Sequence, residues 1–429
     1  MAQYLVKKAS LNGTITIPSS KSHTMRSILF GALGNGKSVI HRYLPSADAQ
    51  AMIAACRLFG ATVDVSSDYL EIEGIKGIVQ NTEDIIHAGN SGIVLRFCSA
   101  IGALASHPIV ITGDYSIRHN RPMQPLLDAL SQLGVLAASM RGDGYAPVII
   151  RGPIQPGKIV ISGEDSQPVS ALLIASAFAG EPMEISVKNP GERPWIALTL
   201  KWFDQLGIPY ENESYARYRL SGNARYAGFK YTVPGDFSSA AFPIAAALIT
   251  QSELALANID MNDSQGDKEL ISVFQKMGAN IVIDDHCKTL HVKKGSSLSG
   301  TSVDINNFID AITILAVVAC FAEGKTVIRN GIIAKQKECN RIQCITTELK
   351  KMGADITETE DGLVIRKSSL KGTHVHSYND HRMAMSLTAA ALGAQGETTI
   401  SSVECVSKTF PTFVRDFNAL GANINEVGR

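Results

Sequence analysis

The sequence predicts an α/β protein with two domains, each built from three similar units. Six segments share the same order of a strand, a polar turn, a helix rich in Ala and Leu, and a second strand. They recur about every 70 residues, at 16–33, 86–104, 161–178, 232–249, 304–321 and 376–392. Six copies in a chain of 429 residues favour two domains of three units over one open sheet.

The first and fourth segments are the most alike, and each follows a strand that contains proline. These strands, "TITIPSSKS" (14–22) and "KYTVPGDFSS" (230–239), are natural crossings between the domains. We therefore expect one domain at residues 20–233. The other domain would combine residues 1–19 with residues 234–429.

Composition limits the classes of partner. The chain has 40 basic and 40 acidic side chains, so no net charge attracts nucleic acid or an anionic membrane. The first ten residues, "MAQYLVKKAS", lack a signal-peptide core, and the apolar run "AITILAVVACFA" is too short for a bilayer. Seven irregularly spaced cysteines fit reduced thiols better than a disulfide framework. We expect a cytoplasmic monomer that binds small molecules.

One stretch, "GALGNGKSVI" (31–40), matches the phosphate-binding P-loop pattern. A true P-loop follows a strand and opens a helix, whereas here helical spacing comes first and the alternating "SVIHRYL" follows. The same helix-to-strand order recurs at 177–185, 321–328 and 393–400. We therefore predict a turn, with Lys37 on its surface.

The polar turn of each unit stands where a strand leads into the N-terminus of a helix. Backbone N–H groups and the positive end of the helix dipole favour anions there. Eight basic residues lie in or near these turns: Lys21, Arg26, Arg96, Arg121, Lys337, Arg341, Arg382 and Lys408. The sequence thus predicts an anion-binding site. No metal site is expected, because the neighbouring His286, Cys287 and His291 lie in an alternating pattern typical of a turn and a strand.

Seven motifs resemble the enolpyruvyl transferase family, and within it the branch that acts on shikimate-3-phosphate. They are "PSSKSHTMR" (18–26), "AGNSGIVLR" (88–96), "RPMQPLLDAL" (121–130), "SQPVSALL" (166–173), "KECNR" (337–341), "YNDHRMAM" (378–385) and "SKTFPTF" (407–413). The resemblance implies an inverse α/β barrel fold: two domains of three βαβαββ units, with the active site in the cleft between them.

The implied reaction transfers the enolpyruvyl group of phosphoenolpyruvate to the 5-hydroxyl of the acceptor and releases phosphate, without metal or cofactor. By the resemblance, Lys21 and Asp310 handle the hydroxyl proton, and Glu338 handles the proton at C3. The implied phosphoenolpyruvate-binding residues are Lys21, Gly92, Arg121, Gln167, Arg341, Arg382 and Lys408. The implied acceptor-binding residues are Lys21, Ser22, Arg26, Asp165, Ser166, Gln167, Glu192, Arg193, Trp195, Asp310 and Lys337.

Several residues depart from the family pattern. Asp165 and Glu192 stand where serines usually surround the 3-phosphate. A carboxylate at about 4 Å from an anion costs roughly 4 kcal/mol at an effective dielectric of 20. A related acceptor without a phosphate therefore stays open as an alternative. Ile93 replaces a threonine beside the phosphoenolpyruvate pocket, so bulkier inhibitors, glyphosate among them, are expected to bind poorly.

Other classes fit less well. The sister branch that uses UDP-N-acetylglucosamine usually carries a reactive cysteine in the loop matching "GDYSIRHNRP" (113–122), and this chain has none between Cys98 and Cys287. RNA 3′-phosphate cyclases use related repeats, but the chain lacks a basic stripe. A binding protein without activity is a further alternative, although the expected acid, base and cationic residues are all present.

Overall fold

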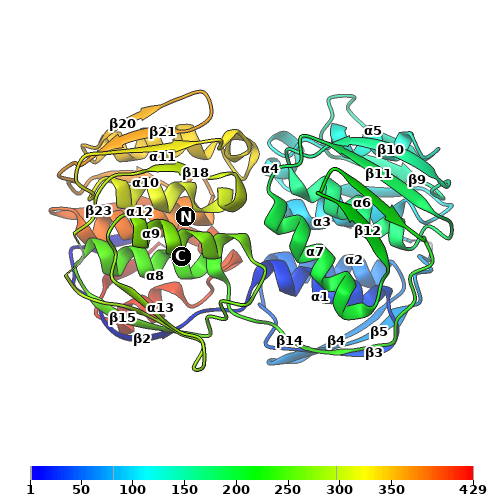
Figure 1. Ribbon diagram of the computed structural model, residues 1–429, viewed down its shortest axis with the longest axis horizontal. Coiled ribbons are helices and arrows are strands. Elements are labelled where there is room, and N and C mark those ends of the chain that lie inside the picture. The colour runs from blue at the N-terminus through cyan, green and yellow to red at the C-terminus, as the bar shows by residue number, and fades with distance from the viewer. Residues whose placement is uncertain (1, 81, 296, 429) are drawn as a thin grey trace. The chain divides into compact units, whose positions relative to one another are not determined.

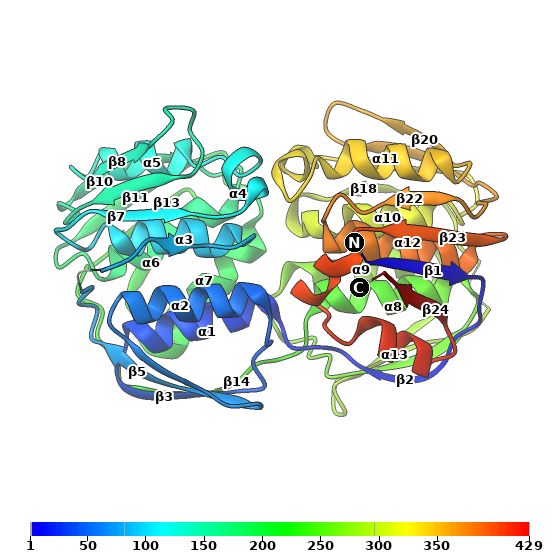
Figure 2. The same ribbon diagram turned by 180° about the vertical axis from the view of Figure 1, so that it is seen from behind.

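The computed structural model describes residues 2–80, 82–295 and 297–428. The chain forms two compact units, one of residues 19–233 and one that combines residues 1–18 with 234–429. Each unit repeats one supersecondary pattern three times (Figures 1 and 2).

The unit of residues 19–233 has three βαβαββ repeats. The first repeat consists of β14 (Lys230–Thr232), α1 (Lys21–Leu33), β3 (Asn35–His41), α2 (Ala47–Leu58), β4 (Thr62–Val65) and β5 (Tyr69–Ile75). The second consists of β6 (Ile86–His87), α3 (Gly92–Gly102), β7 (Ile109–Thr112), the short α4 (Tyr115–His119), α5 (Gln124–Ser131), β8 (Leu136–Ser139) and β9 (Val148–Arg151). The third consists of β10 (Gly157–Ser162), α6 (Ser166–Ala177), β11 (Met183–Lys188), α7 (Arg193–Leu206), β12 (Tyr210–Glu213) and β13 (Arg217–Leu220).

The unit of residues 1–18 and 234–429 repeats the pattern with added 3₁₀ turns. Its first repeat consists of β2 (Asn12–Thr16), α8 (Phe237–Ile249), β15 (Glu253–Ala257), η1 (Gly266–Lys268), α9 (Glu269–Lys276), β16 (Ile281–Asp284) and β17 (Thr289–Val292). The second consists of β18 (Ser302–Asp304), η2 (Asn306–Ala311), α10 (Ile312–Ala319), β19 (Lys325–Arg329), η3 (Ile332–Gln336), α11 (Arg341–Lys351), β20 (Asp355–Glu358) and β21 (Leu363–Arg366). The third consists of β22 (His374–His376), α12 (His381–Gly393), β23 (Glu397–Ser401), η4 (Val403–Lys408), α13 (Phe413–Ala419), β24 (Asn423–Val427) and β1 (Gln3–Lys7).

All six repeats use the same sheet topology. In the described residues the strands form six four-stranded sheets, and each has one parallel pair followed by two antiparallel pairs. In one sheet the register places Ile159 beside Ile185 and Ile185 beside Tyr218, so three buried side chains form one row on the core face. The sheets confirm the predicted α/β class and its six repeats.

The helices that follow the polar turns fill the inside of each unit. All residues of α3, α8 and α10 are buried, and α12 is buried from His381 to Leu392. A helix that is apolar on every side belongs inside a protein, and its many alanines let neighbouring helices approach closely. In the second unit α8, α10 and α12 pack against one another, with strands around them (Figures 1 and 2). Helices inside and strands outside give the inverse barrel arrangement.

The P-loop-like stretch is a turn, as predicted. Helix α1 ends at Leu33, Gly34 is its C-cap, and the rest of the motif lies in strand β3. Lys37 is half exposed and forms an ion pair with Glu71 at 2.6 Å. In a P-loop a strand comes before the motif and a helix follows it, whereas here helix α1 comes first and strand β3 follows. The motif therefore does not form a nucleotide-binding loop.

Candidate active site

Among the described helices, α1, α7, α11 and α12 each carry a basic residue at the first or second position, where the helix dipole disfavours positive charge. Lys21 is the first residue of α1, Arg341 is the first of α11, and Arg382 is the second of α12. A misplaced charge at such an end costs about 0.3–1 kcal/mol. Cations at these helix N-termini become favourable when a multiply charged anion binds beside them, because the anion attracts both the cations and the helix dipole.

Arg341 is the centre of a charged cluster in the unit of residues 1–18 and 234–429. Its Nε donates to Asp380 Oδ2 at 2.7 Å, and Nη1 donates to Asp310 Oδ1 at 2.6 Å. Its Nη2 donates to Glu338 Oε2 at 2.7 Å. The guanidinium side chain is 1% exposed. One buried arginine thus fixes the orientation of three carboxylates.

Two further cations complete the cluster. Arg382 Nη2 donates to Asp310 Oδ2 at 2.8 Å, and Lys408 Nζ donates to Glu338 Oε1 at 2.9 Å. Asp310 therefore lies between two guanidinium groups, and Glu338 lies between a guanidinium and an ammonium group. The structure brings together five of the predicted site residues.

Burial alone would lower the pKa of Arg341, but the charges of Asp380, Glu338 and Asp310 raise it well above its ordinary value. The guanidinium therefore stays charged at every physiological pH. Its three carboxylates depend on that charge, since each ionised acid in the interior needs a partner.

In the unit of residues 19–233, Arg26 is a buried cation in neutral surroundings. Its guanidinium donates to Thr199 Oγ1 at 2.9 and 3.0 Å and to the carbonyl oxygens of Ser22 and Trp195. Within the described part of the chain these partners are all uncharged. Burial lowers the pKa of Arg26 to about 9, so the group is charged at neutral pH. A buried cation among neutral partners is suited to bind an anionic ligand.

A second group in this unit surrounds Arg96, whose side chain is 2% exposed. Arg96 Nη1 donates to Gln167 Oε1 at 2.7 Å, and Nη2 forms an ion pair with Asp165 Oδ2 at 3.1 Å. A Cβ on Gly92 would lie 3.1 Å from Gln167 Oε1 and 3.8 Å from Arg121 Cζ. Gly92, Gln167 and Arg121 therefore lie close together.

The structure changes the interpretation of the two unexpected carboxylates. Asp165 is the N-cap of α6, accepts a hydrogen bond from the Gln167 amide, and pairs with Arg96. Glu192 is 1% exposed and accepts from both the backbone N–H and the hydroxyl of Ser166. Each carboxylate is thus engaged within the protein. The expected repulsion between Asp165 and a phosphorylated acceptor is reduced, because Arg96 offsets the charge of Asp165.

The remaining predicted residues have varied surroundings. Lys21 Nζ lies 3.9 Å from Asp48 Oδ2, and Lys337 is buried. Trp195 is half-buried, whereas Arg193 is exposed and lies over the ring of Tyr215.

Sequence reasoning missed Asp380, Thr199 and Asp48 as parts of these clusters. Asp380 is the N-cap of α12. Its position before a helix predicts capping but does not predict its ion pair with Arg341. Thr199 is 173 residues from Arg26 in the chain, so no local pattern could pair them.

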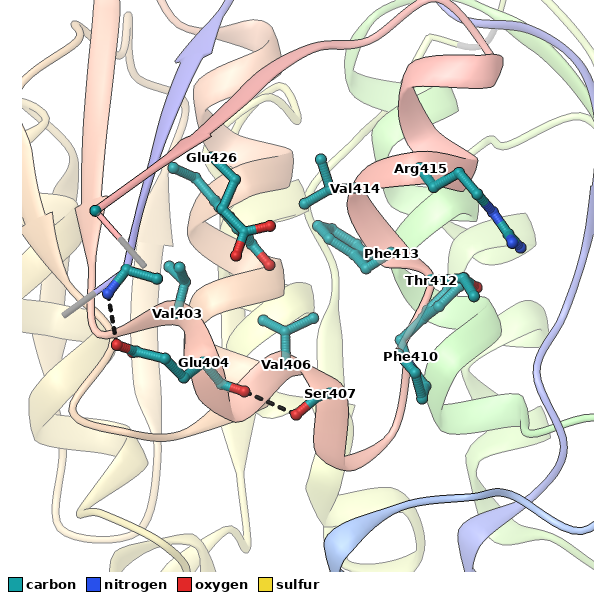
Figure 3. Close-up of a pocket in the computed structure, with 14 residues that line it drawn as sticks. Val403, Glu404, Val406, Ser407, Phe410, Thr412, Phe413, Val414, Arg415 and Glu426 are labelled. Carbon is teal, nitrogen blue, oxygen red and sulfur yellow. Dashed lines mark hydrogen bonds between the residues drawn. The ribbon is translucent and has the colours of Figure 1, made fainter. Parts of the chain in front are cut away.

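A separate pocket of about 670 Å³ lies in the unit of residues 1–18 and 234–429 (Figure 3). Its walls come from the start of β1, from η4, from the segment leading into α13, and from β24. Glu404 accepts a hydrogen bond from the Ala2 backbone N–H at its edge (Figure 3). Of the described residues that line it, none belongs to the predicted catalytic set, so this pocket is distinct from the charged cluster.

Two other structural features bear on function. Among the described residues, no group of three or more His, Cys, Asp or Glu side chains is arranged to hold a metal ion. The described helices are all too short or too polar to span a bilayer.

Comparisons with known proteins agree with the resemblance seen in the sequence. The model of the family described as EPSP synthase (3-phosphoshikimate 1-carboxyvinyltransferase) matches residues 5–417. A 3-phosphoshikimate 1-carboxyvinyltransferase of Chlamydia caviae is 44% identical over 428 residues, which is 99% of this chain and 95% of that protein. One of Acetivibrio thermocellus is 43% identical over 98% of both chains. The solved structure of EPSP synthase from Acinetobacter baumannii aligns over 100% of both chains with a TM-score of 0.83 and 28% identity. The family predicted from the motifs is confirmed, and the chain belongs to the EPSP synthase family.

Proposed function

We propose that this protein transfers the enolpyruvyl group of phosphoenolpyruvate to the 5-hydroxyl of shikimate-3-phosphate and releases inorganic phosphate. The observation that carries the proposal is the cluster in which Asp310 and Glu338 are held by three cations. The names of the full-length relatives support the same reaction.

The reaction needs two proton transfers and an anion clamp. The acceptor hydroxyl oxygen attacks C2 of phosphoenolpyruvate while C3 gains a proton. The tetrahedral adduct then loses phosphate as C3 gives up a proton, which restores the double bond. Asp310 and Lys21 handle the hydroxyl proton, and Glu338 handles the proton at C3. The cations on both sides of Asp310 and of Glu338 hold each carboxylate in position.

Arginine forks suit the carboxylate and phosphate groups of phosphoenolpyruvate. Arg121, Arg341, Arg382 and Lys408 form this clamp, and Gly92 leaves room for the ligand beside Gln167. The bond from Arg96 to Gln167 Oε1 turns the amide nitrogen of Gln167 away from Arg96, so that the nitrogen can donate to a ligand oxygen.

The acceptor is bound by Ser22, Arg26, Ser166, Gln167, Trp195 and Lys337. The buried guanidinium of Arg26 receives the acceptor carboxylate, and Lys337 contacts the 3-phosphate. Asp165 and Glu192 influence acceptor binding indirectly. Asp165 does so through its ion pair with Arg96, and Glu192 does so through the hydrogen bond that it accepts from Ser166. The protein acts as a cytoplasmic monomer, and the reaction itself calls for no cofactor because phosphate is the leaving group.

Purified protein with phosphoenolpyruvate and shikimate-3-phosphate is expected to release phosphate and form the enolpyruvyl product. Phosphate release and product mass should be followed together. Shikimate, quinate and UDP-N-acetylglucosamine serve as control acceptors, and each should give much slower turnover. Faster turnover with shikimate than with shikimate-3-phosphate would favour the acceptor without a phosphate. Phosphate release with UDP-N-acetylglucosamine would move the protein to the sister branch.

The substitution Gly92→Ala should raise the KM for phosphoenolpyruvate about tenfold, because small displacements of binding groups have large kinetic effects. The new methyl group would lie 3.1 Å from both Arg96 Nη1 and Gln167 Oε1, so these side-chain ends must move. Stability should not fall, since alanine favours the helix more than glycine does. Steady-state kinetics and thermal melting test both statements. The control Gly157→Ala meets only ordinary contact with Leu133 at 3.8 Å and should leave KM unchanged. An unchanged KM in Gly92→Ala would remove Gly92 from the site.

A further inference from the structure

The turn that leads into α12 has an unusual backbone. Tyr378 and Asn379 both adopt left-handed conformations, with φ of 58° and 55°. Asparagine tolerates this region, but a bulky residue such as tyrosine rarely enters it. Two such residues in succession strain the backbone, so surrounding contacts must hold them in this conformation.

Glu348, near the C-terminal end of α11, provides those contacts. Its side chain is fully buried. Oε1 accepts from the Tyr378 hydroxyl at 2.6 Å, and Oε2 accepts from the His376 backbone N–H at 3.0 Å. Lys351 Nζ lies 2.9 and 2.8 Å from the two oxygens and offsets the charge. Burial and the bond to Glu348 raise the pKa of Tyr378 above its ordinary value, so the hydroxyl remains a donor.

The residue that follows this turn orders the charged cluster. Asp380 accepts from the backbone N–H groups of Arg382 and Met383 and so caps α12. Its other oxygen accepts from Arg341 Nε at 2.7 Å. The direction of the turn therefore fixes where Asp380 lies, and with it the guanidinium of Arg341 and the start of the helix that carries Arg382.

Arg341 and Glu348 lie seven residues apart on α11, which is about two helical turns and places them on the same face. One end of this face binds Asp380 through Arg341. The other end binds the turn before Asp380 through Glu348. Helix α11 therefore contacts the segment 376–380 at two points, and these two contacts fix the conformation of the segment.

We propose that Glu348 is a positioning residue for the phosphoenolpyruvate clamp: through Tyr378 and His376 it holds the left-handed turn that places Asp380, Arg341 and Arg382. The effect on phosphoenolpyruvate rests on the proposed function, whereas the effect on the turn does not. Glu348 itself touches no substrate in this scheme.

Two variants test the contact directly. Tyr378→Phe removes one hydroxyl, and Glu348→Gln keeps the size of the side chain but weakens the network around the turn. Each should raise the KM for phosphoenolpyruvate about tenfold and change the KM for shikimate-3-phosphate less than twofold. In the double variant the two effects should not multiply, because both substitutions break the same contact.

Asn379→Gly tests the backbone argument. Glycine adopts the left-handed conformation with little cost, so adding this substitution to Glu348→Gln should recover most of the lost affinity for phosphoenolpyruvate. The control variant Ile345→Val lies on the same helix and is fully buried. It should lower the melting temperature slightly, because one buried methyl group is lost, without changing either KM.

Hydrogen exchange separates this inference from the proposed function, because it needs no activity. Glu348→Gln should lower the protection of amides at 376–383, and Ile345→Val should not do so selectively. Unchanged protection there would overturn the inference even if the enzyme is active. Lower protection with an unchanged KM for phosphoenolpyruvate would reduce Glu348 to a purely structural role. If the unmodified protein shows no turnover, calorimetric binding of phosphoenolpyruvate replaces KM, and an equal affinity in Glu348→Gln would overturn the inference.

Discussion

Replacing Arg341 with methionine is expected to lower the free energy of unfolding by about 3–5 kcal/mol and to abolish turnover. The substitution keeps much of the side-chain volume but removes the cation that binds Asp310, Glu338 and Asp380. Three acidic groups would then lie near one another with reduced compensation. Urea unfolding followed by circular dichroism measures the stability, and phosphate release measures the activity.

The stability deficit of Arg341→Met should become smaller as the solution is acidified from roughly pH 8 to pH 5. Protonation removes the repulsion among the carboxylates that lost their partner, so the variant gains stability relative to the unmodified protein. Arg415→Met is the matched control, since its side chain is 76% exposed and pairs with Asp416 at the surface. This control should change stability by less than about 0.5 kcal/mol. A similar loss in both variants would contradict the role of Arg341 as the centre of the cluster.

Replacing Asp310 with asparagine should lower kcat by about 10²- to 10⁴-fold, the range typical for loss of a general acid or base. Asparagine keeps the shape of the side chain, but its amide cannot take up the acceptor proton. It can also accept only one of the two charged bonds that Asp310 receives from Arg341 and Arg382. Pre-steady-state measurement of the chemical step, with both substrates saturating, tests this expectation.

Asp304→Asn is the control for Asp310→Asn. Asp304 is an exposed residue in the same repeat, where its carboxylate accepts from Asn306 and Asn330. Its substitution should leave kcat unchanged. If Asp310→Asn raises only KM and leaves kcat intact, Asp310 binds a substrate and handles no proton, and the acid–base assignment must change.

The sequence by itself determined the six-fold repeat and the family to which the chain belongs. Six similar segments predicted the six sheets because strands, polar turns and buried helices have local periodicity that each segment carries within itself. The P-loop-like stretch was resolved in the same way, because the order of helix and strand around Gly34 and Lys37 is a local property. The family resemblance implied Asp310, Glu338, Arg341, Arg382 and Lys408 as site residues, and the structure brings these five side chains together.

Only the tertiary structure decided how these charges are shared. Asp380 lies 39 residues from Arg341 in the chain, and Gln167 lies 71 residues from Arg96. The sequence alone suggested that Asp165 repels a phosphate, whereas in the folded protein it caps α6 and pairs with Arg96. No sequence pattern indicated the left-handed turn that Glu348 holds. Local patterns report capping and periodicity, but the energy of a buried charge depends on the partners that folding brings to it.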